Sequence, residues 1–132
     1  MSYQTPKTNW KPTDYFNIED YNRIKGNIKE VYTLAITVYP SFLIEDMGGD
    51  VTYTTIPRAE DFNHFENNLV RIRDGTYPFF PEKAHVWYAN QPAPSYKDFN
   101  RWEQNLKVMH DTLYWQDKNR KMLSFTLNGG DL

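Results

Sequence analysis

The sequence repeats one motif three times. "EDYNRIKGNIKEV" begins at Glu19, "EDFNHFENNLVRI" at Glu60 and "KDFNRWEQNLKVM" at Lys97, and the three stretches align without a gap. The aspartates that occupy the second place of each copy are 41 and 37 residues apart. A period of this size is typical of a repeated supersecondary unit. The 132 residues are therefore expected to form one compact module built from three similar parts.

The apolar residues of each copy follow helical spacing. Four bulky positions are separated by three, four and three residues, which places them on one stripe of an α-helix and does not fit the alternation of a half-buried strand. We predict amphipathic helices near residues 17–39, 57–74 and 95–115 that pack as a bundle. The predicted repeat core consists of Tyr21, Ile24, Ile28 and Val31 in the first copy, Phe62, Phe65, Leu69 and Ile72 in the second, and Phe99, Trp102, Leu106 and Met109 in the third.

Polar residues recur in the copies as regularly as the apolar ones. The repeated aspartate follows Asn17 and Ser95 by three residues in two copies, which is the spacing of a capping box at a helix start. Neither asparagine position of a copy is required for packing, so we predict that these amides hydrogen-bond the backbone of a segment beside each helix. The alternative is that duplication copied them without a role. The repeated polar residues are Asp20, Asn22 and Asn27, then Asp61, Asn63 and Asn68, then Asp98, Asn100 and Asn105.

The connections between the helices contain patterns typical of strands. Residues 51–55 alternate, "AHVWYA" at 84–89 reads as a short strand, and residues 122–127 precede the turn-like "NGG". The expected fold is mainly α with short β elements in the connections and at the C-terminus. We divide the chain into an extended N-terminal arm (1–16), a three-repeat helical module (17–121) and a C-terminal strand or tail (122–132). Connections of this length allow parallel or antiparallel helices.

Composition narrows the function. The balance of 15 basic and 17 acidic residues gives no electrostatic footprint for a nucleic acid. The longest apolar run, residues 31–44, is broken by Pro40 and is too short to span a bilayer, and the N-terminus does not resemble a secretory signal, so we expect no membrane partner. No cysteine is present, which excludes disulfides and thiolate chemistry.

No motif indicates catalysis. His64, His85 and His110 share no metal-ligand spacing, and no phosphate-binding glycine loop or nucleophile elbow occurs. Acidic pairs such as Asp46 with Asp50 are explained by turns and helix starts. We therefore expect a protein that is not an enzyme, with no catalytic residues, no metal and no cofactor.

Aromatic residues are concentrated in the segments outside the repeats. One interpretation is that they pack against the helices or at subunit contacts, since aromatic rings dominate core and interface energetics. The other is that some stack on sugar rings. The candidate ligand or partner contacts are Tyr77, Phe79, Phe80, Trp87 and Tyr88.

The segment "NWKPTDYFNIEDYNRIKGNI", the later "RWEQNL" and the closing "LSFTLNGGDL" resemble small structural proteins in the tail or baseplate module of tailed bacteriophages of Gram-positive bacteria, and of phage-tail-like particles. The resemblance covers the three repeat helices and the last ten residues. It implies a non-enzymatic protein that assembles as a homo-oligomer, contacts other tail or baseplate proteins, and is found in the virion after assembly in the host cytoplasm.

Two further functions stay open at this point. The chain could be a receptor- or carbohydrate-binding tail tip that uses its aromatic loops on a host surface saccharide. It could also be a regulatory or anti-host phage protein that is missing from the particle.

Overall fold

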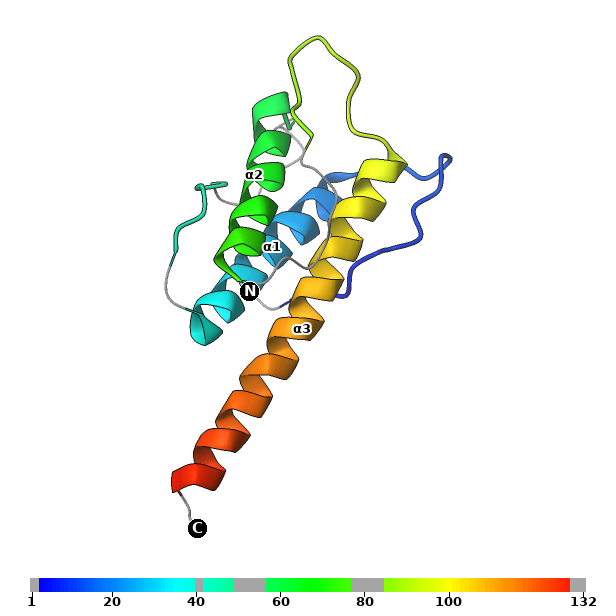
Figure 1. Cartoon of the computed structure of the whole chain (residues 1–132). Coiled ribbons are helices and arrows are strands. Elements are labelled where there is room, and N and C mark those ends of the chain that lie inside the picture. The colour runs from blue at the N-terminus through cyan, green and yellow to red at the C-terminus, as the bar shows by residue number, and fades with distance from the viewer. Residues whose placement is uncertain (1–2, 40–41, 49–56, 77–84, 129–132) are drawn as a thin grey trace.

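The computed structural model describes residues 3–39, 42–48, 57–76 and 85–128, with side chains up to residue 120. Three helices account for most of these residues: α1 (Ile18–Val38), α2 (Ala59–Gly75) and α3 (Tyr96–Asn128). They run in the same direction (Figure 1), and the described parts of the connections, residues 42–48 and 85–95, are not helical. The parallel arrangement, which the sequence left open, brings equivalent positions of the three copies to the same level.

The repeated aspartate begins each helix in the same way. The carboxylates of Asp20, Asp61 and Asp98 accept the backbone N–H of the residue three positions earlier, at 3.0, 2.7 and 2.9 Å. In α1 the bond is reciprocated by the Asn17 side chain, which completes a capping box. Each carboxylate thus satisfies an exposed backbone donor at the positive end of the helix dipole.

The three helix stripes meet in one core. Of the twelve repeat positions, eleven are buried and Phe62 is partly buried. Near the helix starts the rings of Tyr21, Phe65, Phe62 and Trp102 form a chain of contacts with centroids 4.9 to 6.1 Å apart. Aromatic pairs at these distances add to the free energy gained from area burial. The copies therefore bury their stripes against one another within a single chain.

The predicted β elements are the main error of the sequence analysis. Among the described residues there is no strand. Residues 122–127 form the last turns of α3, because no helix-breaking residue interrupts the sequence before Gly129. Residues 85–88 are extended, but their backbone bonds a side chain instead of another strand. The predicted strand at 51–55 lies outside the described residues.

Helix α3 is much longer than predicted. Thr37 and Tyr39, at the end of α1, reach Arg120 and Gln116 of α3 through hydrogen bonds of 3.0 and 3.1 Å. Beyond that level α3 continues alone to Asn128 and projects past the other two helices (Figure 1). The sequence analysis ended this helix near residue 115.

Candidate functional site

Four of the six repeated asparagines hold extended backbone by two hydrogen bonds each. The Asn100 amide accepts the Trp10 N–H at 2.7 Å and donates to the Trp10 carbonyl at 3.0 Å. Asn63 makes the same pair of bonds to Trp87 at 2.7 and 2.8 Å. A side-chain amide thus provides the donor and the acceptor that a neighbouring strand would otherwise supply. This is the contact predicted for the repeated asparagines.

The second asparagine of a copy binds backbone in the same manner. Asn27 holds Gln4 at 2.8 and 2.7 Å, and Asn68 holds Glu45 at 2.7 and 3.0 Å. Both amides are almost completely buried. The bonds therefore have little competition from water, and their loss would leave buried polar groups unpaired.

A buried glutamate on α3 joins three elements. The Trp10 indole N–H donates to one carboxylate oxygen of Glu103, and the Lys7 backbone N–H donates to the other at 3.0 Å. Arg23 of α1 forms a two-point contact with the same carboxylate at 2.8 and 2.9 Å. Glu103 is fully buried, and a buried charge is unfavourable unless it is paired. One arginine and two N–H donors supply that pairing. We call this group of contacts the α1–α3 junction.

The same arrangement occurs between α2 and α3. The Trp87 indole donates to Glu66 at 3.0 Å, and Arg101 of α3 holds that carboxylate at 2.7 and 2.6 Å. Glu66 occupies the position of Glu103 in its copy, and Arg101 the position of Arg23. We call this group the α2–α3 junction. The two junctions are related by the internal repeat of the chain.

Both arginines stay charged in these surroundings. Burial acts to lower the pKa of Arg23 and Arg101, but the hydrogen bonds and charges of Glu103 and Glu66 outweigh burial and raise the pKa above its ordinary value. Each junction is therefore a charged pair with bidentate geometry, the strongest form of hydrogen bonding between side chains.

The third junction of the repeat, between α1 and α2, has different residues. His64 stands where the other copies have arginine, and Lys25 stands where they have glutamate. His64 bonds Glu45 at 2.7 Å, and the Lys25 ammonium lies 5.3 Å from the Tyr21 ring centroid. The repeat is thus regular in its backbone and varied in its buried charges.

Asn105 is the exception among the buried asparagines. Its Nδ2 has no hydrogen-bond partner among the described residues, although the side chain is buried. The first asparagine of the first copy, Asn22, lies half-buried on α1. The paired backbone contact is therefore established at four positions, Asn27, Asn63, Asn68 and Asn100.

The aromatic candidates are divided by the structure. Trp87 is buried and its indole is occupied by Glu66, whereas Tyr88 is 65% exposed. Tyr77, Phe79 and Phe80 lie outside the described residues. Trp10, which the sequence analysis assigned to an extended arm, is buried in the core.

The arginine–glutamate pairs were not predicted from the sequence. Arginine recurs at the fifth place of the first and third copies, and glutamate at the seventh place of the second and third. Because each feature occurs in only two copies, and not in the same two, the alignment alone does not reveal the pairing.

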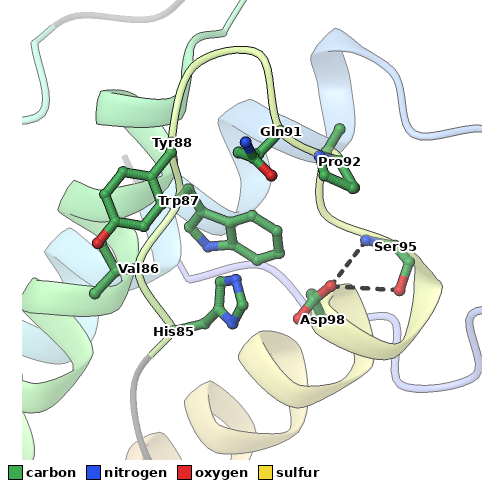
Figure 2. A pocket seen from close by; sticks show the side chains of 9 residues that line it. His85, Val86, Trp87, Tyr88, Gln91, Pro92, Ser95 and Asp98 are labelled. Atoms are coloured by element: carbon green, nitrogen blue, oxygen red, sulfur yellow. Dashed lines mark hydrogen bonds between the residues drawn. The ribbon is translucent and has the colours of Figure 1, made fainter.

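A surface groove of about 820 Å³ lies between the segment after residue 84 and the start of α3. Figure 2 shows Trp87 and His85 in its centre, with Tyr88 and Val86 on one side and Ser95 and Asp98 on the other. The His85 ring lies 4.1 Å from the Trp87 ring, and Asp98 is bonded to Ser95. The groove therefore combines aromatic and apolar surface with a carboxylate.

In the described part of the chain, no group of three or more His, Cys, Asp or Glu side chains is placed to hold a metal ion. Within the same residues, none of the helices is long and apolar enough to cross a membrane.

Comparison of the chain with protein-family models, with curated proteins and with solved structures gave no match.

Proposed function

We propose that this protein is a non-enzymatic assembly part of a phage-like virion tail or baseplate, and that it acts as a homo-oligomer. The observation that carries the proposal is the free end of α3. The helix has 33 residues, about 50 Å at 1.5 Å per residue, and its last turns project past α1 and α2 (Figure 1).

The outer face of α3 carries exposed apolar side chains before the helix leaves the bundle. Tyr114 and Trp115 are 51% and 65% exposed next to each other, and Val108 is 47% exposed one heptad before Trp115. Met122 follows Trp115 by a further heptad in the sequence. Apolar residues at this spacing are typical of a helix that packs against another helix. A short helical end without such packing is only marginally stable in water.

The internal polar residues support a structural role. The amides and carboxylates that recur in the sequence hold the extended segments of the same chain, as described for the junctions. Together with the resemblance to phage tail proteins, this supports a part whose own fold is rigid and whose long helix contacts other subunits.

The experiment is a measurement of solution mass. Wild-type protein is expected to be oligomeric by sedimentation, whereas Trp115→Ser, or a chain ending at Arg120, is expected to be smaller with unchanged cooperative unfolding. Tyr15→Ser is the matched control, because Tyr15 is 90% exposed but lies far from α3's free end in sequence. A monomeric wild type, or absence of the protein from purified particles, would contradict the proposal.

A second candidate function is saccharide binding in the groove of Figure 2. The favouring observation is the exposed Tyr88 ring on the opposite side of the groove from the Asp98 carboxylate, since an aromatic face and a hydrogen-bond acceptor are the groups that sugars use. Tyr88→Ala should then abolish binding to cell-wall polysaccharide, while Tyr15→Ala should not. Equal binding of the two variants, or none by wild type, would reject this function.

A further inference from the structure

The N-terminal residues 3–10 contact the helices as a bound peptide would. We call these residues the docking segment. Gln4 is held by Asn27 and Trp10 by Asn100, each through both backbone groups, and the Trp10 indole reaches Glu103. The Tyr3 ring stacks on His110 of α3 with centroids 3.6 Å apart. Main-chain bonds of this kind give affinity, and side-chain pockets give specificity.

The docking segment is joined to the first helix by a link that is mostly exposed. A link from Lys11 to Phe16 connects it to the N-cap of α1, and Lys11, Pro12, Thr13 and Tyr15 are exposed. The link is held by the Lys7–Asp14 ion pair of 3.2 Å and by local turn bonds, and at its end the Phe16 ring stacks on Phe99 with centroids 4.1 Å apart. Between the docking segment and Phe16, the ion pair and the turn bonds are therefore the contacts that oppose departure of the segment.

The α2–α3 junction binds a tryptophan in the same way, but that tryptophan has a different position in the chain. Trp87 is bound by the same three residue types, but it lies inside the chain between α2 and α3. Its release would disturb both flanking connections. The docking segment carries the other bound tryptophan, Trp10, on the N-terminal side of α1.

We propose that the α1–α3 junction also accepts the docking segment of a second copy of this chain, so that neighbouring subunits exchange N-terminal segments. This inference rests on the homo-oligomeric function proposed above, and it identifies the docking segment and the α1–α3 junction as a contact between the subunits. In the closed form, the docking segment binds its own chain; in the exchanged form, it binds the neighbouring chain. The same hydrogen bonds form in both, so the two forms differ only in the path of the link and in the association of the chains. A high local concentration in an assembly favours the exchanged form.

The first test adds the segment as a separate molecule. A fluorescent peptide of residues 1–11 is titrated into the full chain carrying Trp10→Ala, whose own segment is weakened. Saturable binding is expected, with at least a tenfold loss of affinity when the peptide itself carries Trp10→Ala. The matched control chain carries Trp87→Ala, which leaves the docking segment in place and should gain no binding.

The variant chain's folding is followed in the same titration. If the Trp10→Ala chain is unfolded in the absence of peptide, addition of the wild-type peptide is expected to restore the helical circular dichroism of that chain. Absence of binding and of restored helicity, or equal binding of the two peptides, would overturn the proposal.

The second test identifies the second copy as the source. Full chains with Tyr3→Cys are mixed with full chains carrying His110→Cys and Trp10→Ala, which is possible because the wild-type sequence lacks cysteine. A disulfide-linked heterodimer is expected, and it should be reduced at least tenfold when the donor also carries Trp10→Ala. No heterodimer, or the same yield from both donors, would reject exchange between copies. Because α3's free end is intact throughout, failure here leaves the mass measurement as a separate test of the proposed function.

Discussion

The two arginine–glutamate junctions and the third junction of the repeat have the same backbone plan but different chemistry. At the α1–α3 and α2–α3 junctions a buried glutamate binds a tryptophan indole and a bidentate arginine. At the α1–α2 junction the corresponding residues are Lys25 and His64. The apolar stripe and the asparagine contacts are therefore sufficient to give each copy the same backbone arrangement, while the buried charged residues differ from copy to copy.

That distinction has a physical use in a chain of three similar units. Three identical helices could pack in either order around the core. An arginine–glutamate pair forms only where a helix that carries the arginine lies beside one that carries the glutamate, so it favours one order. A misplaced unit would bury an unpaired charge, which is strongly unfavourable. The charges therefore contribute specificity to a core that apolar packing alone would leave ambiguous.

The largest effect is expected from removing the carboxylate of the α1–α3 junction. Glu103→Ala leaves the partly buried Arg23 with Asp20 as its remaining carboxylate partner. It also leaves the buried Trp10 indole and the Lys7 backbone N–H without their acceptor, so we expect a loss of about 3 to 5 kcal/mol in the free energy of unfolding. Urea denaturation measures the loss. Glu30→Ala is the matched control on a helix surface and should change stability by about 0.5 kcal/mol or less. A loss below about 1 kcal/mol would show that the pair is not important for stability.

The second prediction compares two equivalent asparagines. Asn68→Ala removes both bonds to the Glu45 backbone at a buried position and should cost about 2 to 3 kcal/mol. Asn105→Ala should cost less than about 1 kcal/mol, because the Nδ2 of Asn105 has no partner among the described residues. The two variants are compared by thermal and urea unfolding. Equal losses would contradict the difference that the structure shows.

The sequence was sufficient to predict the helices and their cores. Tyr21, Phe62 and Phe99 lie at the same place on three helices because four apolar positions at 3.6-residue spacing leave no other regular structure. The asparagine contacts were also predictable, since asparagine recurred at positions where packing did not require it. The arginine–glutamate pairs join residues about 35 and 80 positions apart in the sequence, and nothing local specifies such a pair.

Two of the three predicted strands, at residues 84–89 and 122–127, were predicted wrongly for a related reason. An extended segment such as residues 85–88 has the composition of a strand, but its backbone groups are satisfied by Asn63. The amino-acid composition indicates that a segment is extended, but it does not indicate whether a strand or a side chain binds its backbone. At residues 122–127 a short apolar stretch fits strand and helix alike, and the preceding helix decided the outcome.

The third prediction converts the α1–α2 junction to the plan of the other two. Lys25→Glu alone places a buried carboxylate where no arginine stands, so it should destabilise the protein. His64→Arg in the same chain supplies the cation, and the double variant should recover about 1 to 3 kcal/mol relative to the sum of the single variants. A double-mutant cycle in urea measures this coupling energy. No coupling would mean that the three junctions are not geometrically equivalent.

The smallest effect concerns the interaction that the α1–α2 junction has in place of an arginine pair. The hydrogen bond from His64 holds the pKa of Glu45 below its ordinary value. A carboxyl group with a lowered pKa stabilises the fold above its unfolded-state pKa, about 4.3, and this stabilisation is lost as the pH falls through the lowered value. His64→Ala should therefore raise the pKa of Glu45 in an NMR titration and reduce stability at neutral pH by at most about 1 kcal/mol, since Glu45 is partly solvated. The difference from wild type should shrink toward pH 3, whereas Lys107→Ala, which removes an exposed pair with Asp111, should leave the Glu45 titration unchanged. A stability difference that persists unchanged at low pH would indicate that His64 acts by packing instead of through the carboxylate, and the α1–α2 junction would then differ from the other two in kind.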